Sequence, residues 1–337
     1  MSESKIKEYL RLTRLEYSGF SCVVVIGALT VKGSALEFTD AVLLFFLNVL
    51  TLIWAFVHND YCDYEIDRRS KVLLERPLVK GTVSRKAALN IVVICVVINL
   101  MIALLVIKNI ALAVILVASI ILSIFYNAFS KEITGADFFY AASATLLVLF
   151  GALAVTDQKS VHELGPLTWI MLAIQFSDHF FFNAVEGGLK DVDNDSRQEA
   201  KTLASRSVIR QGHEMRVSRT FRACFLLLKM MTVFLVFTPF VFFELPYYFW
   251  QLLALGVLSA ASVFYTVKIL DVNLHDRRAV GRYALKQELA CKSLIPIMLS
   301  AFIGLPWVAF LILVPFIWFN LFNYLLYGKL FALPESF

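Results

Sequence analysis

Three aspartates stand close together directly after an apolar run in the first fifth of the chain. Asp60, Asp63 and Asp67 occupy positions i, i+3 and i+7 within the segment 59–67. At 100° per residue of an α-helix, this spacing places all three carboxylates within about 60° of one helical face. The segment therefore predicts a stripe of carboxylates at the end of a helix.

A second acidic cluster follows another apolar run, at residues 191–195. Asp191 and Asp195 are four residues apart and share a helical face, whereas Asp193 points largely away from them. The two apolar runs that lead into the clusters are expected to cross the bundle in the same direction. Both clusters can therefore face each other across the interior of a helical bundle.

Carboxylates held this close together repel one another and need a cation to neutralise them. Mg²⁺ suits such oxygen ligands, since it typically takes one or two carboxylates, several waters and the oxygens of a substrate phosphate. One cluster alone is as well explained by a solvated face at the membrane surface, but the pair, with Lys and Arg around it, predicts a magnesium diphosphate site. A calcium loop is excluded because Ser196 stands where an EF-hand needs Gly and Thr202 where it needs Glu.

The elements that must position these clusters are membrane helices. Of the 337 residues, 59% are hydrophobic and 17% are charged, and soluble proteins carry roughly 25% charged residues. Five scattered cysteines without a C-x-x-C pair favour neither a disulfide framework nor a zinc site. The first apolar run lacks a small-residue cleavage site, so we expect it to be kept as an anchor. The net charge of +5 reflects topology, and we expect no nucleic-acid partner.

Apolar runs of about 20 residues, the length that crosses a bilayer as a helix, recur along the chain. Eight predicted spans lie near residues 15–32, 41–59, 87–107, 110–128, 136–156, 165–185, 220–243 and 247–269. The stretch from Ser293 to Tyr327 is too long for one crossing, and Gly304-Leu305-Pro306 breaks it into a ninth span and a tenth, C-terminal span at about 306–327. The sequence predicts an all-α polytopic membrane bundle that forms one domain over residues 1–337.

Basic residues concentrate at alternate connections, in the N-terminal segment and in loops 60–86, 186–219 and 268–292. Because basic residues near span ends stay in the cytoplasm, this pattern predicts a cytoplasmic N-terminus and cytoplasmic active-site loops. Arg277 and the other basic residues of the last loop have two explanations. They either meet a charged acceptor or contact anionic membrane lipid, and we favour the lipid.

Ionisable residues also occur inside the sixth predicted span. Asp178 and His179 lie near its middle, where charged groups are costly and usually face a cavity or a partner. From His179 a polar stripe continues at helical spacing toward the second cluster, through Asn183, Glu186 and Lys190. Either this stripe lines an acceptor pocket or it is a hydrogen-bonded network between helices.

The two acidic segments resemble the signatures of the UbiA superfamily of intramembrane prenyltransferases. Residues Asn59–Asp67 match its N-D-x-x-D-x-x-x-D motif, and Asp191–Asp195 match its second motif, D-x-x-x-D. The similarity extends to Arg76-Pro77 with Gly81, as in the family's R-P-x-x-x-G element, and to Lys201-Thr202-Leu203. The predicted spans agree with the family over most of the chain, and the segment after about Pro306 exceeds its usual nine helices.

The resemblance implies nine transmembrane helices around a central cavity that opens laterally to lipid, with two Mg²⁺ ions holding a polyprenyl diphosphate. It assigns the catalytic and metal-binding roles to five carboxylates: Asp60, Asp63, Asp67, Asp191 and Asp195. The residues expected to bind substrate are Asn59, Arg76, Tyr126, Lys131, Lys190 and Lys201. Tyr126 and Lys131 stand in for a Tyr-x-x-x-Lys element with one extra residue, so both reach one diphosphate only if the helix that carries Tyr126 has ended before Lys131.

The implied activity is transfer of the polyprenyl group to an acceptor, after the metals have neutralised the leaving diphosphate and an allylic carbocation has formed. We favour an aromatic quinone precursor as the acceptor; the alternative is geranylgeranylglyceryl phosphate or another lipid. A secondary transporter is the hypothesis from a different class. Transporters commonly bind near the bilayer midplane, whereas these acidic clusters lie at span ends on one face, which favours the enzyme.

Overall fold

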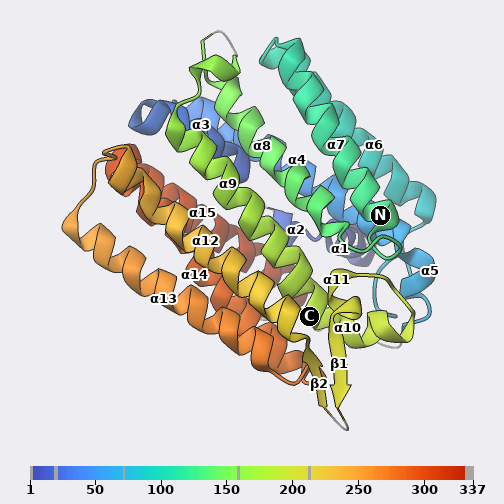
Figure 1. Cartoon of the computed structure of the whole chain (residues 1–337). Helices are drawn as coiled ribbons and strands as arrows, with labels where there is room; N and C mark the ends of the chain where they lie inside the picture. The colour runs from blue at the N-terminus through green and yellow to red at the C-terminus, as the bar shows by residue number, and fades with distance from the viewer. Residues whose placement is uncertain (1–2, 19–21, 71–72, 158–159, 212–213, 331–337) are drawn as a thin grey trace.

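Long helices form most of the molecule (Figure 1). The computed structural model describes residues 3–18, 22–70, 73–157, 160–211 and 214–330. The α-helices are α1 (Glu3–Leu12), α2 (Leu15–Ser18), α3 (Val23–Lys32), α4 (Phe38–Cys62), α5 (Tyr64–Asp67), α6 (Arg85–Met101), α7 (Ile110–Phe129), α8 (Asp137–Ala154), α9 (Pro166–Phe181), α10 (Gly188–Arg197), α11 (Leu203–Arg206), α12 (Arg219–Phe242), α13 (Phe249–Asp271), α14 (Arg277–Ile303) and α15 (Leu305–Tyr327). Two 3₁₀ turns, η1 (Gly33–Ala35) and η3 (Val161–Glu163), and two π-helical turns, η2 (Ile102–Val106) and η4 (Phe182–Gly187), complete the helical elements.

The predicted polytopic helical membrane bundle is confirmed. In the described part of the chain, seven helices are long and apolar enough to cross a membrane: α4, α6 extended to Leu105, α7, α8, α12, α13 and α15. This number is smaller than the predicted nine plus one. The first predicted span is divided between α2 and α3, α9 has 16 residues and continues into a π-helical turn, and α14 begins with a charged half.

The predicted break before the C-terminal helix is confirmed, but the preceding loop is shorter than expected. Gly304, with φ of 80°, separates α14 from α15, and glycine adopts this left-handed conformation without steric cost. The expected loop 268–292 is mostly helical, because α14 already begins at Arg277. Asp276 caps it by accepting a hydrogen bond from the Ala279 backbone nitrogen at 2.9 Å.

A two-stranded antiparallel hairpin departs from the predicted all-α chain. Strands β1 (Val208–Gln211) and β2 (Glu214–Val217) pair in a register that places Val208 opposite Val217. Met215 is fully buried, and its carbonyl accepts a hydrogen bond from the Leu274 backbone nitrogen at 2.9 Å. The hairpin therefore fastens the loop before α12 to the end of α13, a long-range contact that local sequence patterns do not reveal.

Helices α3 and α8 approach closely at two glycines. A Cβ atom on Gly27 would lie 2.0 Å from the Val148 carbonyl oxygen, and one on Gly151 would lie 1.9 Å from the Val24 carbonyl oxygen. Within membranes, where helix association depends on van der Waals packing, small residues allow this close backbone contact. The pair holds together two helices that belong to the interior of the bundle.

We expect Gly151→Ala to destabilise the folded protein, because the added methyl group forces α3 and α8 apart. Overpacking of this kind costs about 1–3 kcal/mol. Gly256→Ala in α13 is the matched control, since no atom lies within 4 Å of the position of its Cβ, and alanine favours helix by roughly 1 kcal/mol over glycine. Thermal unfolding in detergent should give a lower Tm for the first variant only; equal Tm values would contradict the packing argument.

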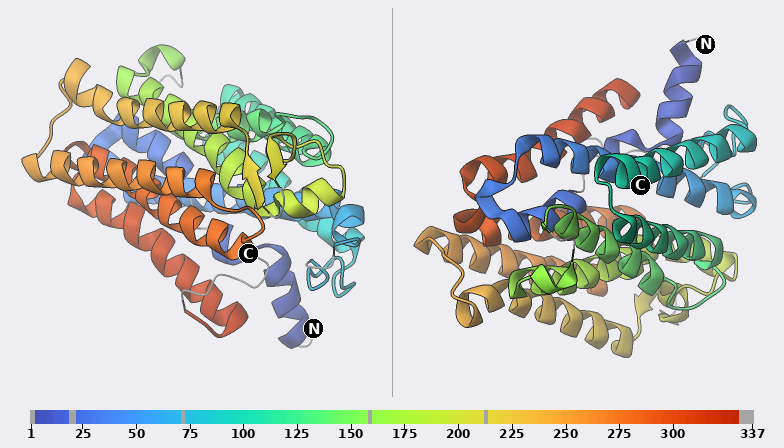
Figure 2. Two further views of the ribbon diagram at one scale, coloured as in Figure 1. Left: turned by 60° about the horizontal axis from the view of Figure 1, so that its bottom comes forward. Right: turned by 90° about the horizontal axis from the view of Figure 1, so that it is seen from above.

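The polar elements gather at one end of the bundle. In Figure 1, α5, α10, α11 and the hairpin lie together at the lower right, where the helices that carry both acidic motifs end, and Figure 2 shows the same grouping from other sides. Helix α1 projects from the bundle near this end (Figure 2). The bundle thus places the two predicted acidic clusters on a common face.

Candidate active site

A cavity of about 970 Å³ opens among the helices at this polar end. Its walls come from α2, α4, α7, α9 with η4 and α10, α14 and α15. Ten of the eleven predicted site residues line it: Asn59, Asp60, Asp63, Asp67, Arg76, Tyr126, Lys131, Lys190, Asp191 and Asp195. The two acidic clusters, far apart in the sequence, therefore share one cavity.

The first acidic cluster lies where α4 passes into α5. Asp60, Asp63 and Asp67 are buried, with at most 9% of each residue exposed. Arg76 donates to Asp60 at 3.1 Å and also to Asp67, so one guanidinium bridges two of the carboxylates. Arg14 donates to Asp60 at 2.5 Å. These charge-assisted contacts compensate the buried carboxylates of Asp60 and Asp67.

The second cluster lies on a helix that continues through a π-helical turn. The Gly187-Gly188 pair does not end the helix: η4 leads directly into α10. Lys131 donates to both Asp195 oxygens, at 2.8 and 3.0 Å, and Arg277 donates to Asp191 at 2.9 Å. Asp193, predicted to point away, bonds Arg197 at the surface and does not line the cavity.

Tyr126 and Lys131 meet the geometric condition that the sequence set for them. Helix α7 ends at Phe129, so the chain turns before Lys131 and both side chains reach the cavity. The Tyr126 hydroxyl donates to the Asn183 side-chain oxygen at 3.0 Å, and Asn183 donates to Asp137 at 2.7 Å. This chain of contacts links α7, α8 and η4 around the cavity.

Lys201 is the predicted site residue that the structure places elsewhere. Its side chain is exposed and lines a separate, smaller hollow. Its backbone nitrogen donates to the Lys131 carbonyl oxygen at 2.7 Å. Lys201 thus supports the segment that presents Lys131 to the cavity, while the neighbouring Thr202 is the residue that lines it.

Two arginines of the site were not among the residues expected to bind substrate. Arg14 belongs to the basic N-terminal segment, from which the sequence predicts only the membrane topology. It adopts a left-handed backbone conformation, with φ of 44°, between α1 and α2. Arg277, for which lipid contact was favoured, bonds Asp191 and lines the cavity. The sequence offered only one signal for them, which is that both are basic residues on the side of the acidic motifs.

Asp63 differs from the other four carboxylates of the two clusters. Within the described residues, no salt bridge or hydrogen bond joins its side chain to a cation, and burial raises its pKa to about 7. A buried carboxylate in this situation suits an incoming cation. Lys190, across the cavity, has its pKa lowered to about 8 by burial, against the opposing effect of Asp191.

The donor set fits Mg²⁺ brought in with a phosphorylated substrate. No group of three His, Cys, Asp or Glu side chains forms a ready-made metal cage among the described residues. Mg²⁺ does not require one, because it keeps several waters and combines one or two carboxylates with substrate phosphates. The carboxylates on facing walls provide such partial ligation, including Asp63, which has no direct contact with a cation among the described residues.

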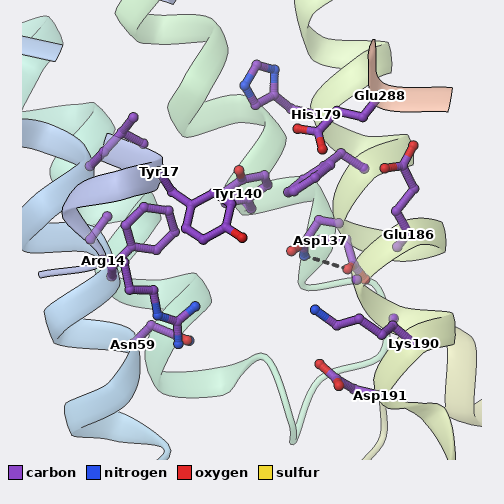
Figure 3. A pocket seen from close by; sticks show the side chains of 18 of the residues that line it. Arg14, Tyr17, Asn59, Asp137, Tyr140, His179, Glu186, Lys190, Asp191 and Glu288 are labelled. Carbon is purple, nitrogen blue, oxygen red and sulfur yellow. Dashed lines mark hydrogen bonds between the residues drawn. The ribbon is translucent and has the colours of Figure 1, made fainter. Parts of the chain in front are cut away.

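Above the acidic clusters the cavity has a second polar wall. Figure 3 shows Glu186, Glu288 and His179 on the side of Lys190 and Asp191, with Tyr17 and Tyr140 in the middle of the pocket and Arg14 and Asn59 opposite. The polar stripe on the sixth predicted span therefore lines the cavity at His179, Asn183 and Glu186. Asp178 also lines the cavity, and Lys229 of α12, 1% exposed, pairs with it at 3.2 Å. The ionisable residues of this span therefore both line the cavity and link α9 to α12.

Comparison with known proteins decides the family. The model of the UbiA prenyltransferase family matches residues 20–280, most of the chain. The chain belongs to the UbiA prenyltransferase family. It is accordingly a multi-pass integral membrane protein, and the matched residues include both acidic motifs and Arg76 but end within α14.

Solved structures of UbiA proteins share the fold. A digeranylgeranylglyceryl phosphate synthase is 19% identical, with a TM-score of 0.64 over 90% of this chain and 100% of that one. A UbiA homolog from Aeropyrum pernix K1 in its apo form is 20% identical, with a TM-score of 0.64 over 86% and 98%. A UbiA homolog from Archaeoglobus fulgidus, solved bound to GPP and Mg²⁺, is 16% identical, with a TM-score of 0.52 over 86% and 99%.

One curated relative matches part of the sequence. Digeranylgeranylglyceryl phosphate synthase from Thermococcus kodakarensis is 36% identical over 86 residues. The aligned segment covers 25% of this chain and 30% of that protein.

Proposed function

We propose that this UbiA protein transfers a polyprenyl group from its diphosphate to a lipid acceptor of the geranylgeranylglyceryl phosphate type. The observation that carries the proposal is the convergence of two carboxylate clusters and their cationic partners on one cavity. The site binds the diphosphate at the polar end and leaves the prenyl chain among apolar helices. Water is kept from the reacting carbon by these walls, which protects an allylic cation from hydrolysis.

Mg²⁺ is the proposed cofactor, as two ions, held by Asp60, Asp63 and Asp67 on one wall and by Asp191 and Asp195 on the other. When bound, it supplies Lewis-acid stabilisation of the departing diphosphate. Support comes from the donor set of the cavity and from the Archaeoglobus fulgidus homolog, which has been solved with GPP and Mg²⁺.

The side chains of this protein bind and orient the diphosphate. Arg76 and Arg14 reach the first cluster, whereas Lys131 and Arg277 reach the second. Lys190 lies beside Asp191 in the same cavity. Asn59 adds an amide donor, and Tyr126, whose hydroxyl donates to Asn183, lines the same cavity. Cations and hydrogen-bond donors on two facing walls can hold the diphosphate before and after its bond to the prenyl carbon breaks.

The named relatives support a lipid acceptor over the aromatic acceptor that the sequence favoured. One curated relative and one solved structure are digeranylgeranylglyceryl phosphate synthases. Five cations that line the cavity accompany the carboxylates of the clusters: Arg14, Arg76, Lys131, Lys190 and Arg277. Such cations can bind the phosphate of a phosphorylated lipid as well as the diphosphate of the donor.

Purified full-length protein in nanodiscs, incubated with labelled geranylgeranyl diphosphate, tests this proposal. We expect a Mg²⁺-dependent ether product with geranylgeranylglyceryl phosphate and no product with hydroxybenzoate or naphthoate acceptors. Product from the aromatic acceptors alone would overturn the lipid assignment. If the protein consumes no donor with any acceptor and carries a solute across the membrane of liposomes, the transporter hypothesis replaces the enzyme hypothesis.

We also propose that the N-terminus and the loops of the acidic motifs face the cytoplasm. The support is the concentration of basic residues in those segments, which the positive-inside rule assigns to the cytoplasmic face. A water-soluble donor headgroup would then enter from that side.

A further inference from the structure

Glu186 is set apart from most of the carboxylates that line the cavity. Other acidic side chains above the two clusters have partners: Asp178 pairs with Lys229 at 3.2 Å, Glu288 with Lys292 at 2.8 Å, and Asp137 accepts from Asn183 at 2.7 Å. In the part of the chain that the structure describes, no hydrogen bond or salt bridge involves the Glu186 carboxylate, although the residue is only 5% exposed.

The position of Glu186 relates it to the diphosphate site. It lies in the π-helical turn η4, four residues before Lys190, and therefore about 6 Å deeper along the helix than Lys190. Figure 3 shows its carboxylate above Lys190 and Asp191, on the same side of the pocket, and Glu186 belongs to the lining of the cavity. A molecule that meets the prenyl carbon next to the diphosphate would pass this carboxylate.

Burying a carboxylate without a hydrogen-bond donor is costly. Among the neighbouring charges, Glu288 disfavours a negative charge on Glu186, whereas Lys229 and Lys292 favour it. Each of these lysines is held by another carboxylate. The free acceptor oxygens of Glu186 are thus available to a donor that comes with a bound molecule. A hydroxyl group on the acceptor supplies such a donor, and the reaction requires that this hydroxyl lose its proton.

We propose that Glu186 is the general base that takes the proton from the acceptor hydroxyl; this inference rests on the proposed prenyl transfer. The bond from C1 of the prenyl group to the diphosphate oxygen breaks, and the electron pair of that bond leaves with the diphosphate. The acceptor oxygen then forms a bond to C1 of the resulting allylic cation. The hydroxyl proton passes to a Glu186 carboxylate oxygen. The acceptor class is therefore an alcohol, held with its hydroxyl between Glu186 and the diphosphate.

Glu186→Gln tests the assignment, because glutamine keeps the shape but cannot take the proton. We expect turnover with the lipid alcohol to fall by about 10²–10⁴-fold, the usual contribution of a general base. The affinity for a non-reactive thiolodiphosphate analogue of the donor, measured with Mg²⁺, should stay at the wild-type value. With an acceptor whose hydroxyl is made more acidic by neighbouring fluorine, the deficit of the variant should shrink.

Asp178→Asn is the matched control, since it removes another cavity-facing carboxylate from the same helix. It breaks the pair with Lys229 and should lower thermal stability, with a turnover change that does not depend on acceptor acidity. Wild-type turnover by Glu186→Gln, a deficit equal for both acceptors, or an acidity-dependent deficit in Asp178→Asn would each overturn the proposal. Failure of the proposed function itself is distinct, because the wild-type protein would then consume no donor.

Discussion

Replacing either Asp60 or Asp191 by asparagine is expected to reduce prenyl transfer on the order of 10³-fold, the upper range for loss of one preorganised electrostatic group. Each substitution removes one negative charge from a cluster that would hold Mg²⁺ and the diphosphate. The two residues lie on opposite walls of the same cavity and are bonded to Arg76 and Arg277 respectively. Both variants should lose the Mg²⁺-dependent consumption of labelled prenyl diphosphate.

Asp193→Asn provides the control for these variants. Asp193 lies two residues from Asp191, but its carboxylate bonds Arg197 outside the cavity, and a surface pair of this kind contributes roughly 0–1 kcal/mol. We expect wild-type turnover for this variant. Full activity of Asp60→Asn or Asp191→Asn, with membrane insertion and Tm verified, would contradict the proposed mechanism.

The acidic clusters could be predicted from the sequence because helical periodicity is a local property. The spacing of Asp60, Asp63 and Asp67 fixes their common face wherever the helix lies, and the opposite direction of Asp193 follows from the same rule. Whether Tyr126 and Lys131 can both reach the cavity is also a local question, because it depends only on where α7 ends. The direction of such side chains can be predicted without knowledge of the tertiary structure.

The cationic partners could not be predicted in the same way. Arg14 is 46 residues from Asp60, and Arg277 is 86 residues from Asp191. Their contacts depend on how α1, α2 and α14 pack against the bundle, and the sequence expected a loop where α14 begins. Basic residues near span ends are common for reasons of topology alone. The positive charge of Arg14 and Arg277 therefore did not identify these residues as part of the site.

The turn η4 illustrates a second limit of periodicity. A π-helical turn inserts an additional residue into the helix and shifts the faces that follow it. The stripe from His179 to Lys190 therefore could not be oriented from α-helical spacing alone, and structural and cavity-facing roles were equally consistent with it. In the structure both Asp178 and Glu186 line the cavity, but Asp178 pairs with Lys229 of α12, whereas no ion pair of Glu186 is found among the described residues.

We expect Arg76→Ala both to destabilise the folded protein and to weaken binding of the prenyl diphosphate donor. Arg76 bridges Asp60 and Asp67 inside the protein, and its own pKa, which burial tends to lower, is raised by these carboxylates. Asp60 keeps Arg14 in the variant, but Asp67 loses its guanidinium. Removing one partner of a buried ion pair costs about 3–5 kcal/mol, so Tm should fall clearly.

Mg²⁺ distinguishes a charge effect from a packing effect in this variant. A divalent cation can replace the lost guanidinium between the two carboxylates, so added Mg²⁺ should raise the Tm of Arg76→Ala more than that of the wild-type protein. Lys80→Ala in the same loop is the control, because Lys80 pairs with Glu75 at the surface and its loss should change stability by less than about 1 kcal/mol. If Mg²⁺ raises the Tm of the wild-type protein and of Arg76→Ala by the same amount, Asp60 and Asp67 do not bind the metal in place of Arg76, and the proposal is contradicted.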